Sequence, residues 1–277
     1  MDASFDLGGV QVPRLVYGTA WKEERTASLV AAALAAGFRG IDTANQRKHY
    51  VEAGVGEGLA ASGVPRADVF LQTKFTYARG QDHRLPYDPE ASHTRQVEQS
   101  FARSLEHLRT TYLDSLVLHG PESGTGWSAA DREVWRAMEA LHQAGAVRLL
   151  GVSNIQLGQL EVLCREATVA PRVVQNRTYA RTGWDREVRA FCRARGMAYQ
   201  GFSLLTANRK ELADPRVAAL AARLGATIPQ LVFRFAMEVG MMPLTGTTDP
   251  VHMAEDLAAH RLALAPEDVA MLERIAG

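Results

Sequence analysis

Residues 14–44, RLVYGTAWKEERTASLVAAALAAGFRGIDTA, decide the fold that we expect. The short apolar runs 14–20 and 39–44 are typical of strands, and the Ala- and Leu-rich segment 26–36 between them is typical of a helix that ends at Gly37. A helix-length crossover makes the two strands parallel, because a tight hairpin cannot join parallel strands. This stretch therefore predicts a β-α-β unit.

The same alternation continues to the end of the chain. Six further runs are apolar almost throughout, as in parallel strands that are covered on both faces. These strands are expected at 68–75, 115–120, 147–154, 172–179, 197–203 and 241–247. The remaining helices are expected at 51–62, 92–109, 129–144, 156–167, 184–194, 213–224, 228–239 and 265–275. Eight strand-helix units in 277 residues favour a closed (β/α)8 TIM barrel over an open sheet.

Two features complete the expected organisation. Residues 4–13 predict an N-terminal β-hairpin around Gly8-Gly9. No linker, repeat or low-complexity segment interrupts the chain, so we expect one domain over 1–277. The longest expected loop, 76–91, follows the third strand, and loops of that length tend to be functional or disordered.

The composition excludes several classes of function. Lys+Arg and Asp+Glu number 31 each, so no net field favours nucleic acid or a membrane surface as partner. No apolar run reaches the about 20 residues that span a bilayer, and MDASFDLGGV is not typical of a signal peptide. Cys164 and Cys192 lack C-x-x-C spacing, so we expect no disulfide framework, no metal site and a cytoplasmic location.

Common catalytic motifs are missing from the sequence. The nearest match to the dinucleotide fingerprint G-x-G-x-x-G is 54–59, GVGEGL, which places Leu59 where the third glycine belongs and follows no strand. The stretch 151–155, GVSNI, fails the G-x-S-x-G nucleophile elbow at its last position. The sequence therefore favours neither a Rossmann fold nor a serine hydrolase.

Three titratable residues end consecutive predicted strands. Asp42, Lys74 and His119 lie at the ends of the second, third and fourth strands, where TIM barrels carry their chemistry. A charge buried without a partner is costly, so we expect Asp42 and Lys74 to form an ion pair. Titratable groups that converge in a cleft are typical of an active site, although each could instead lie at a solvated strand end.

Several of these stretches together resemble the aldo-keto reductase family, in collinear order over nearly the whole chain. They are Gly18-Thr19, the run 37–44, Thr73-Lys74, the region 104–119, the run 151–154, Val174-Gln175-Asn176 and the segment 241–257. The resemblance implies a TIM barrel that reduces an aldehyde or ketone, a small-molecule substrate, to an alcohol. It also implies NADPH as the cofactor, bound without a Rossmann domain.

The resemblance assigns a catalytic group of Asp, Tyr, Lys and His. Asp42, Lys74 and His119 match this group directly. The family spacing places the tyrosine five residues after the aspartate, where this chain has Arg47. The nearest tyrosine is Tyr50, and an insertion in this loop accounts for the shift.

The expected chemistry follows from these roles. Tyr50 gives a proton to the carbonyl oxygen as hydride reaches the carbon, and Lys74 is expected to lower the pKa of Tyr50. Asp42 keeps Lys74 charged and oriented, and His119 donates a hydrogen bond to the carbonyl oxygen. His49 is the alternative proton donor if Tyr50 is only a packing residue.

The resemblance also implies the residues that hold the cofactor. Ser153, Asn154 and Gln175 would hold the carboxamide of the nicotinamide, and Phe202 would stack on its ring. The other expected contacts are Gly18, Thr19, Ser203, Leu205, Thr245, Gly246, Thr247, His252 and Asp256. For the substrate pocket we expect aromatic walls from Trp21, Tyr77, Tyr87, Trp127 and Tyr179.

The adenosine end departs from the family pattern. Many members carry a Lys and an Arg that clamp the 2′-phosphate of NADPH, and this chain has Leu244 and His252 there. Hydroxyls such as that of Thr245, and the start of a helix after Pro250, are left to bind a phosphate. NADPH is therefore the expected cofactor, and NADH stays open.

Two other functions are compatible with the residues. One is a different barrel enzyme, a Schiff-base lyase that uses Lys74 as its nucleophile. The other is a barrel that binds a nicotinamide cofactor without turnover, as a binding or regulatory subunit. For the reductase itself we expect a monomer.

Overall fold

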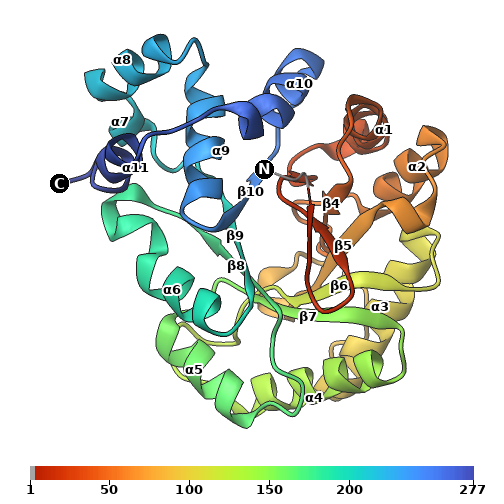
Figure 1. The fold of residues 1–277 in the computed structure, drawn as a ribbon. Helices are drawn as coiled ribbons and strands as arrows, with labels where there is room; N and C mark the ends of the chain where they lie inside the picture. Colours follow the sequence, from red (N-terminus) through yellow and green to blue (C-terminus); the bar gives the residue numbers. More distant parts are fainter. Residues whose placement is uncertain (1–3) are drawn as a thin grey trace.

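Eight parallel strands close into a barrel in the computed structural model, which describes residues 4–277. Around the barrel the strand order is β10-β3-β4-β5-β6-β7-β8-β9, and helices surround the strands (Figure 1). The strands are β3 (Val16–Gly18), β4 (Gly40–Asp42), β5 (Phe70–Phe75), β6 (Leu113–Leu118), β7 (Val147–Ser153), β8 (Val173–Arg177), β9 (Ala198–Phe202) and β10 (Met241–Thr245). Every predicted strand is present, and the predicted TIM barrel is confirmed.

The helices follow the sequence pattern closely. They are α1 (Thr26–Ala36), α2 (Glu52–Ser62), α3 (His93–Leu108), α4 (Ala129–Gln143), α5 (Leu157–Glu166), α6 (Arg186–Ala194), α7 (Arg209–Leu212), α8 (Pro215–Arg223), α9 (Ile228–Glu238), α10 (Pro250–Ala258) and α11 (Pro266–Glu273). Helix α1 ends as predicted, since Gly37 has a φ of 115° and its N–H bonds back to the carbonyls of Ala33 and Leu34. The pattern did not predict the four-residue α7. No helix within residues 4–277 is both long and apolar enough to cross a bilayer.

The predicted hairpin is also present and closes the far end of the barrel. Strands β1 (Ser4–Asp6) and β2 (Gln11–Pro13) pair antiparallel, with Phe5 opposite Val12. Val12 belongs to a small apolar cluster with residues at the beginnings of several barrel strands, such as Phe70 and Val173. The hairpin therefore covers the N-terminal ends of the strands, and the opposite end is left for a ligand.

Strand register brings the polar strand ends together. Asp42 in β4 pairs with Gln72 in β5, two residues before Lys74. Across the barrel, Ser153 at the end of β7 pairs with Gln175 in β8. The chemistry-bearing residues of the sequence thus meet at one end of the barrel.

Helix α2 lies close to its neighbours because it carries glycines at its contacts. A Cβ added at Gly58 would lie 2.5 Å from the carbonyl oxygen of Ala27 in α1. A Cβ at Gly56 would lie 2.1 Å from the carbonyl oxygen of His107 in α3, a backbone atom that cannot move away cheaply. Since α2 directly follows the loop that carries Tyr50, this packing fixes one end of that loop.

We expect Gly56→Ala to lower the free energy of unfolding by about 1–3 kcal/mol, because the added methyl overpacks the α2–α3 contact. This loss would exceed the gain of up to about 1 kcal/mol that alanine normally brings to a helix interior. Urea unfolding measures the free energy of unfolding of this variant and of a matched control. The matched control is Gly158→Ala in α5, where an added Cβ meets no atom within 4 Å and stability should hold or rise. Equal behaviour of the two variants would contradict the packing argument.

Candidate active site

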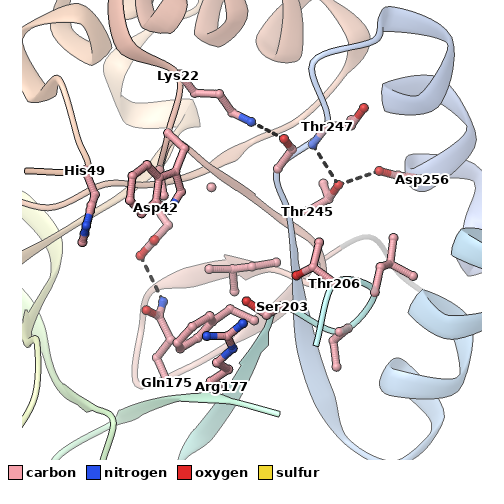
Figure 2. Close-up of a pocket in the computed structure, with 18 of the residues that line it drawn as sticks. Lys22, Asp42, His49, Gln175, Arg177, Ser203, Thr206, Thr245, Thr247 and Asp256 are labelled. Atoms are coloured by element: carbon pink, nitrogen blue, oxygen red, sulfur yellow. Dashed lines mark hydrogen bonds between the residues drawn. The ribbon is translucent and has the colours of Figure 1, made fainter. Parts of the chain in front are cut away.

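A cavity of about 820 Å³ opens where the barrel strands end (Figure 2). Its walls come from the ends of β3, β4, β8, β9 and β10, from the segments that follow them and from α10. Asp42 and Gln175 lie at its base, and Thr245 and Asp256 lie at the side of α10. The volume falls within the range of about 300–1,000 Å³ that is usual for small-molecule and cofactor sites.

A buried ion pair stands beneath the cavity. Lys74 Nζ lies 2.7 Å from each carboxylate oxygen of Asp42 and 2.7 Å from the carbonyl oxygen of Thr43. All three donors of the ammonium are therefore used, and the Lys74 side chain is fully buried. Burial lowers the pKa of Lys74, and the Asp42 carboxylate opposes that shift. The predicted pair is present.

Three glutamines extend the ion pair across the barrel. Asp42 Oδ1 also accepts hydrogen bonds from Gln72 Nε2 at 2.7 Å and from Gln175 Nε2 at 3.0 Å. Both amide nitrogens donate in turn to Gln200 Oε1 at 2.8 Å. The carboxylate is thus saturated with donors in a buried site, which fixes its orientation toward Lys74.

The loop between β4 and α2 brings Tyr50 back to the site through one compact turn. The carbonyl oxygen of Gln46 accepts from His49 N at 3.2 Å and from Tyr50 N at 3.0 Å. This turn absorbs the extra residues that separate Tyr50 from Asp42 in the sequence. The Tyr50 ring centroid consequently lies 5.3 Å from Lys74 Nζ and 6.0 Å from the His119 ring.

The long loop after β5 supports this turn. Gln81 Nε2 donates to the carbonyl oxygen of Asn45 at 2.8 Å, and Gln46 Nε2 donates to that of Gly80 at 2.6 Å. Tyr87, in the same loop, donates its hydroxyl to the Thr76 carbonyl at 2.7 Å. The loop 76–91, which the sequence left as functional or disordered, is therefore a brace for the residues that position Tyr50.

The expectation that the pKa of Tyr50 is lowered is wrong, because other groups outweigh Lys74. Burial, with the Asp42 carboxylate adding to it, raises the pKa of the Tyr50 phenol well above its ordinary value. The Lys74 ammonium favours the phenolate but does not cancel this rise, because its positive charge is paired with the Asp42 carboxylate. Tyr50 is accordingly a phenol that keeps its proton at neutral pH.

His119 is held neutral beside this phenol. Burial lowers the pKa of His119 to about 3, and the positive charge of Lys74 adds to the shift. Nδ1 of His119 shares a hydrogen bond of 2.7 Å with Thr76 Oγ1. This bond fixes the imidazole ring and leaves Nε2 as the other polar atom of the ring.

The depressed pKa of His119 predicts a loss of stability in acid. The unfolded chain binds a proton near pH 6.5, whereas the folded chain does so only near pH 3, so the contribution is complete above pH 6.5 and declines below it. Between pH 7.5 and 5 we expect the free energy of unfolding to fall by up to about 2 kcal/mol more in the wild type than in His119→Asn. Urea titrations at the two pH values measure this difference, and parallel pH dependences would show that His119 is not held neutral.

Most of the expected cofactor residues line the cavity. They are Gly18, Asn154, Gln175, Phe202, Ser203, Leu205, Thr245, Gly246, Thr247, His252 and Asp256. Thr19 and Ser153 do not line it: both are fully buried, and the Thr19 hydroxyl donates to the Asp42 carbonyl. Both were expected to touch the cofactor directly. In the structure they lie behind the cavity wall and support it.

Of the expected aromatic walls, only Trp21 lines the cavity within the described part of the chain. Tyr77 is buried and donates its hydroxyl to Asp131 at 2.9 Å, and Tyr87 and Trp127 lie in the same apolar core. Tyr179 lies under the guanidinium of Arg181 instead. Position next to a strand end did not separate packing aromatics from cavity aromatics, because both types of site accept a large apolar ring.

Two cations in the wall were not singled out from the sequence. Lys22 is only 8% exposed and donates from Nζ to the Gly246 carbonyl, which links the loop after β3 to the loop after β10. Arg177 ends β8, two residues after Gln175 and therefore on the same face of the strand (Figure 2). Arg177 could have been found from the sequence, because a charged residue at the end of a predicted strand is expected at the mouth of a barrel.

Three of the seven non-glycine residues with positive φ in the described chain lie at the cavity. Trp21, Asn154 and Ser203 all line the cavity and have positive φ angles of 61°, 51° and 58°. Non-glycine residues rarely adopt this conformation, and such strain is concentrated at functional sites. Trp21 also stacks on His49, with ring centroids 4.0 Å apart, and its indole is 69% exposed.

Comparison with known sequences and structures agrees with this arrangement. The sequence profile described as "Aldo/keto reductase family" matches residues 7–276. The chain belongs to the aldo/keto reductase family. Members of this family are NADP(H)-dependent oxidoreductases that act on the carbonyl groups of small molecules, so the predicted family and reaction class are confirmed.

Individual aldo/keto reductases are similar over nearly their whole length. Glyoxal reductase of Bacillus subtilis is 29% identical over 274 residues, which are 96% of this chain and 90% of that protein. The crystal structure of an aldo/keto reductase from Brucella melitensis superposes with a TM-score of 0.85 at 28% identity, and the match covers 98% of each chain. A Bombyx mori aldo-keto reductase in complex with NADP has a TM-score of 0.82 at 23% identity, covers 98% of this chain and 92% of its own, and supports the fold.

Proposed function

We propose that this protein reduces a small aldehyde or ketone to the alcohol, with hydride from a nicotinamide dinucleotide and a proton from Tyr50. One observation carries the proposal. The Tyr50 ring lies between the Lys74 ammonium, at 5.3 Å, and the His119 ring, at 6.0 Å, beside a cavity of cofactor size. Tyr50 therefore lies beside Lys74 and His119, although its distance from Asp42 in the sequence differs from the family spacing.

The residues at the base of the cavity fit a nicotinamide. Gln175 uses Nε2 on Asp42 and Gln200, and its Oε1 accepts no hydrogen bond from the described residues. That oxygen is available to a carboxamide N–H, and Asn154 lies on the same wall. Phe202, opposite Arg177 across the β8–β9 pair, also lines the cavity and offers a ring for stacking. A bound reduced nicotinamide would supply the hydride to the carbonyl carbon.

The proton transfer rests on groups of this chain. As hydride reaches the carbonyl carbon, the π electron pair moves to oxygen, and that oxygen takes the proton of the Tyr50 phenol. The raised pKa keeps the phenol protonated until negative charge develops on the substrate. Lys74 then stabilises the phenolate, and water later returns the proton.

His119 is proposed to hold the carbonyl oxygen. In this role Nδ1 accepts from the Thr76 hydroxyl, which is the tautomer that leaves Nε2–H of the neutral imidazole for the carbonyl oxygen. A neutral donor suits this role, because it polarises the carbonyl and leaves the proton of Tyr50 as the one that is transferred.

Tyr50→Phe should lower kcat for carbonyl reduction by about 10²–10⁴-fold, the usual contribution of general acid catalysis. The dissociation constant of the dinucleotide should stay within about twofold, because the phenylalanine ring keeps the packing. His49→Gln is the matched control, since His49 is the neighbouring alternative donor and lines the same cavity. Steady-state kinetics with NADPH and a panel of small aldehydes measure both. A greater loss in the His49 variant would transfer the proton-donor role to His49.

The substrate is proposed to be a small carbonyl compound. Glyoxal, named by the B. subtilis relative, is the natural first member of the panel. The exposed indole of Trp21 is the aromatic wall available to an apolar substituent. Broad specificity is expected, because Trp21 is the only one of the expected aromatic walls that lines the cavity among the described residues.

The Schiff-base alternative does not suit Lys74. An imine requires a free amine that touches the carbonyl carbon. Here the ammonium has no exposed surface, makes three hydrogen bonds and is absent from the wall of the cavity within the described residues. Binding without turnover remains the second candidate because of the displaced tyrosine, and the Tyr50 kinetics decide it.

We also propose that 1–277 forms one domain that acts as a monomer in the cytoplasm. The family profile spans 7–276, which supports one domain. Both cysteines are unpaired, which supports a reducing compartment. Among the described residues, the exposed large hydrophobics are Trp21 and Val251, too few for a stable apolar interface. Size-exclusion chromatography with light scattering tests the monomer.

A further inference from the structure

The cations and most of the carboxylates of the cavity come from different elements. Lys22 and Arg177 come from the loop after β3 and the end of β8 (Figure 2). The wall formed by β10 and α10 carries Glu255 and Asp256, with His252 as its one basic side chain. The whole segment 241–258 contains no Lys or Arg.

The start of α10 already holds an anion of its own. The Asp249 carboxylate accepts the backbone N–H of Val251 at 2.8 Å, and Thr247 Oγ1 accepts that of Asp249 at 3.2 Å. A phosphate at this helix terminus would have to displace a carboxylate that caps it. The helix therefore offers little to a second anion.

The hydroxyl nearest to the missing lysine is also committed. Thr245 Oγ1 donates to Asp256 Oδ2 at 2.6 Å, so its proton is not available to a phosphate oxygen. Thr245 Oγ1 then presents lone pairs, as the Asp256 carboxylate does. Acceptors of this kind bind the hydroxyls of a ribose, whereas they repel a phosphate.

Lys22 does not replace the missing clamp. One of its N–H donors goes to the Gly246 carbonyl, and a single ammonium is a point charge without the paired donors of an arginine. Its anchor on Gly246 holds the charge where the loops after β3 and β10 meet. We assign this charge to the phosphates that NADH and NADPH have in common.

On the proposed function, in which this cavity holds a nicotinamide dinucleotide, we propose that it binds NADH and NADPH with dissociation constants within about tenfold of each other. The 2′-phosphate meets acceptors and a histidine at the β10–α10 wall in place of a lysine and an arginine. A hydrogen bond to a charged group typically contributes about tenfold or more to binding, and two such bonds are missing here.

The test measures binding to the intact chain, by titration calorimetry with NADP⁺, NAD⁺ and the fragments 2′,5′-ADP and 5′-AMP, so that the members of each pair differ only in the 2′-phosphate. We expect the 2′-phosphate to change each dissociation constant by less than about tenfold. The ratio should also depend little on salt, because no close ion pair forms at the 2′ position. A preference of about 100-fold or more for the phosphorylated partner in either pair would overturn the proposal.

Three variants locate the effect. Leu244→Lys and His252→Arg should each tighten NADP⁺ by about tenfold and leave NAD⁺ within about twofold. Val251→Lys is the matched control, since Val251 is 64% exposed on the same helix but is not part of the cavity wall. An equal gain from all three would mean that net charge, and not the 2′ site, sets the preference. Absence of binding by both dinucleotides would count against the proposed function itself.

Discussion

The contact between Lys74 and Asp42 is the constraint on which the rest of the site depends. Two opposite charges taken out of water are stable only when every donor and acceptor is satisfied. Here the Thr43 carbonyl, Gln72 and Gln175 complete the set, and they come from three barrel strands or their ends. Loss of either charge would leave the other buried and unpaired, so the strand ends must keep this register.

The same burial sets the protonation of the neighbours. An environment that excludes water raises the pKa of Tyr50 and lowers that of His119, and both groups are neutral for that reason. A low-lying phenol pKa is therefore not what prepares Tyr50. In the proposed reaction, Lys74 stabilises the phenolate as it forms, which is the point at which charge stabilisation accelerates a reaction.

The fold could be predicted from sequence because its signal is repeated eight times. Each strand-helix unit carries the same pattern, and an error in one unit does not change the architecture. The ends of 26–36 were correct to the residue because Gly37 is a helix terminator that acts locally. The meeting of Asp42, Lys74 and His119 could be predicted for a related reason. The C-terminal ends of all the parallel strands lie at the same end of the barrel.

The residues that lie in loops could not be placed in this way. Counting from Asp42 gives Arg47, because a count along the chain does not include the turn at 46–50 that returns Tyr50 to Lys74. Tyr77 and Trp127 failed for the opposite reason: each follows a strand end but turns inward, and nothing in one sequence separates the two directions. Loop residues become predictable only when the contacts that brace the loop are known.

The two ends of the cavity therefore differ in how strongly their residues depend on one another. At the base, chemistry requires charges that are buried and fully paired, so substitution there disturbs the whole network. At the β10–α10 wall Leu244, Thr247 and Glu255 are partly exposed. Thr245 and Asp256 are buried there and satisfy each other without a contact to Lys74. If the β10–α10 wall holds the adenosine end, as proposed, its recognition can change one residue at a time while the proposed proton-transfer group stays intact. The departure of this chain at Leu244 and His252, beside an unaltered Asp42 and Lys74, is what such independence allows.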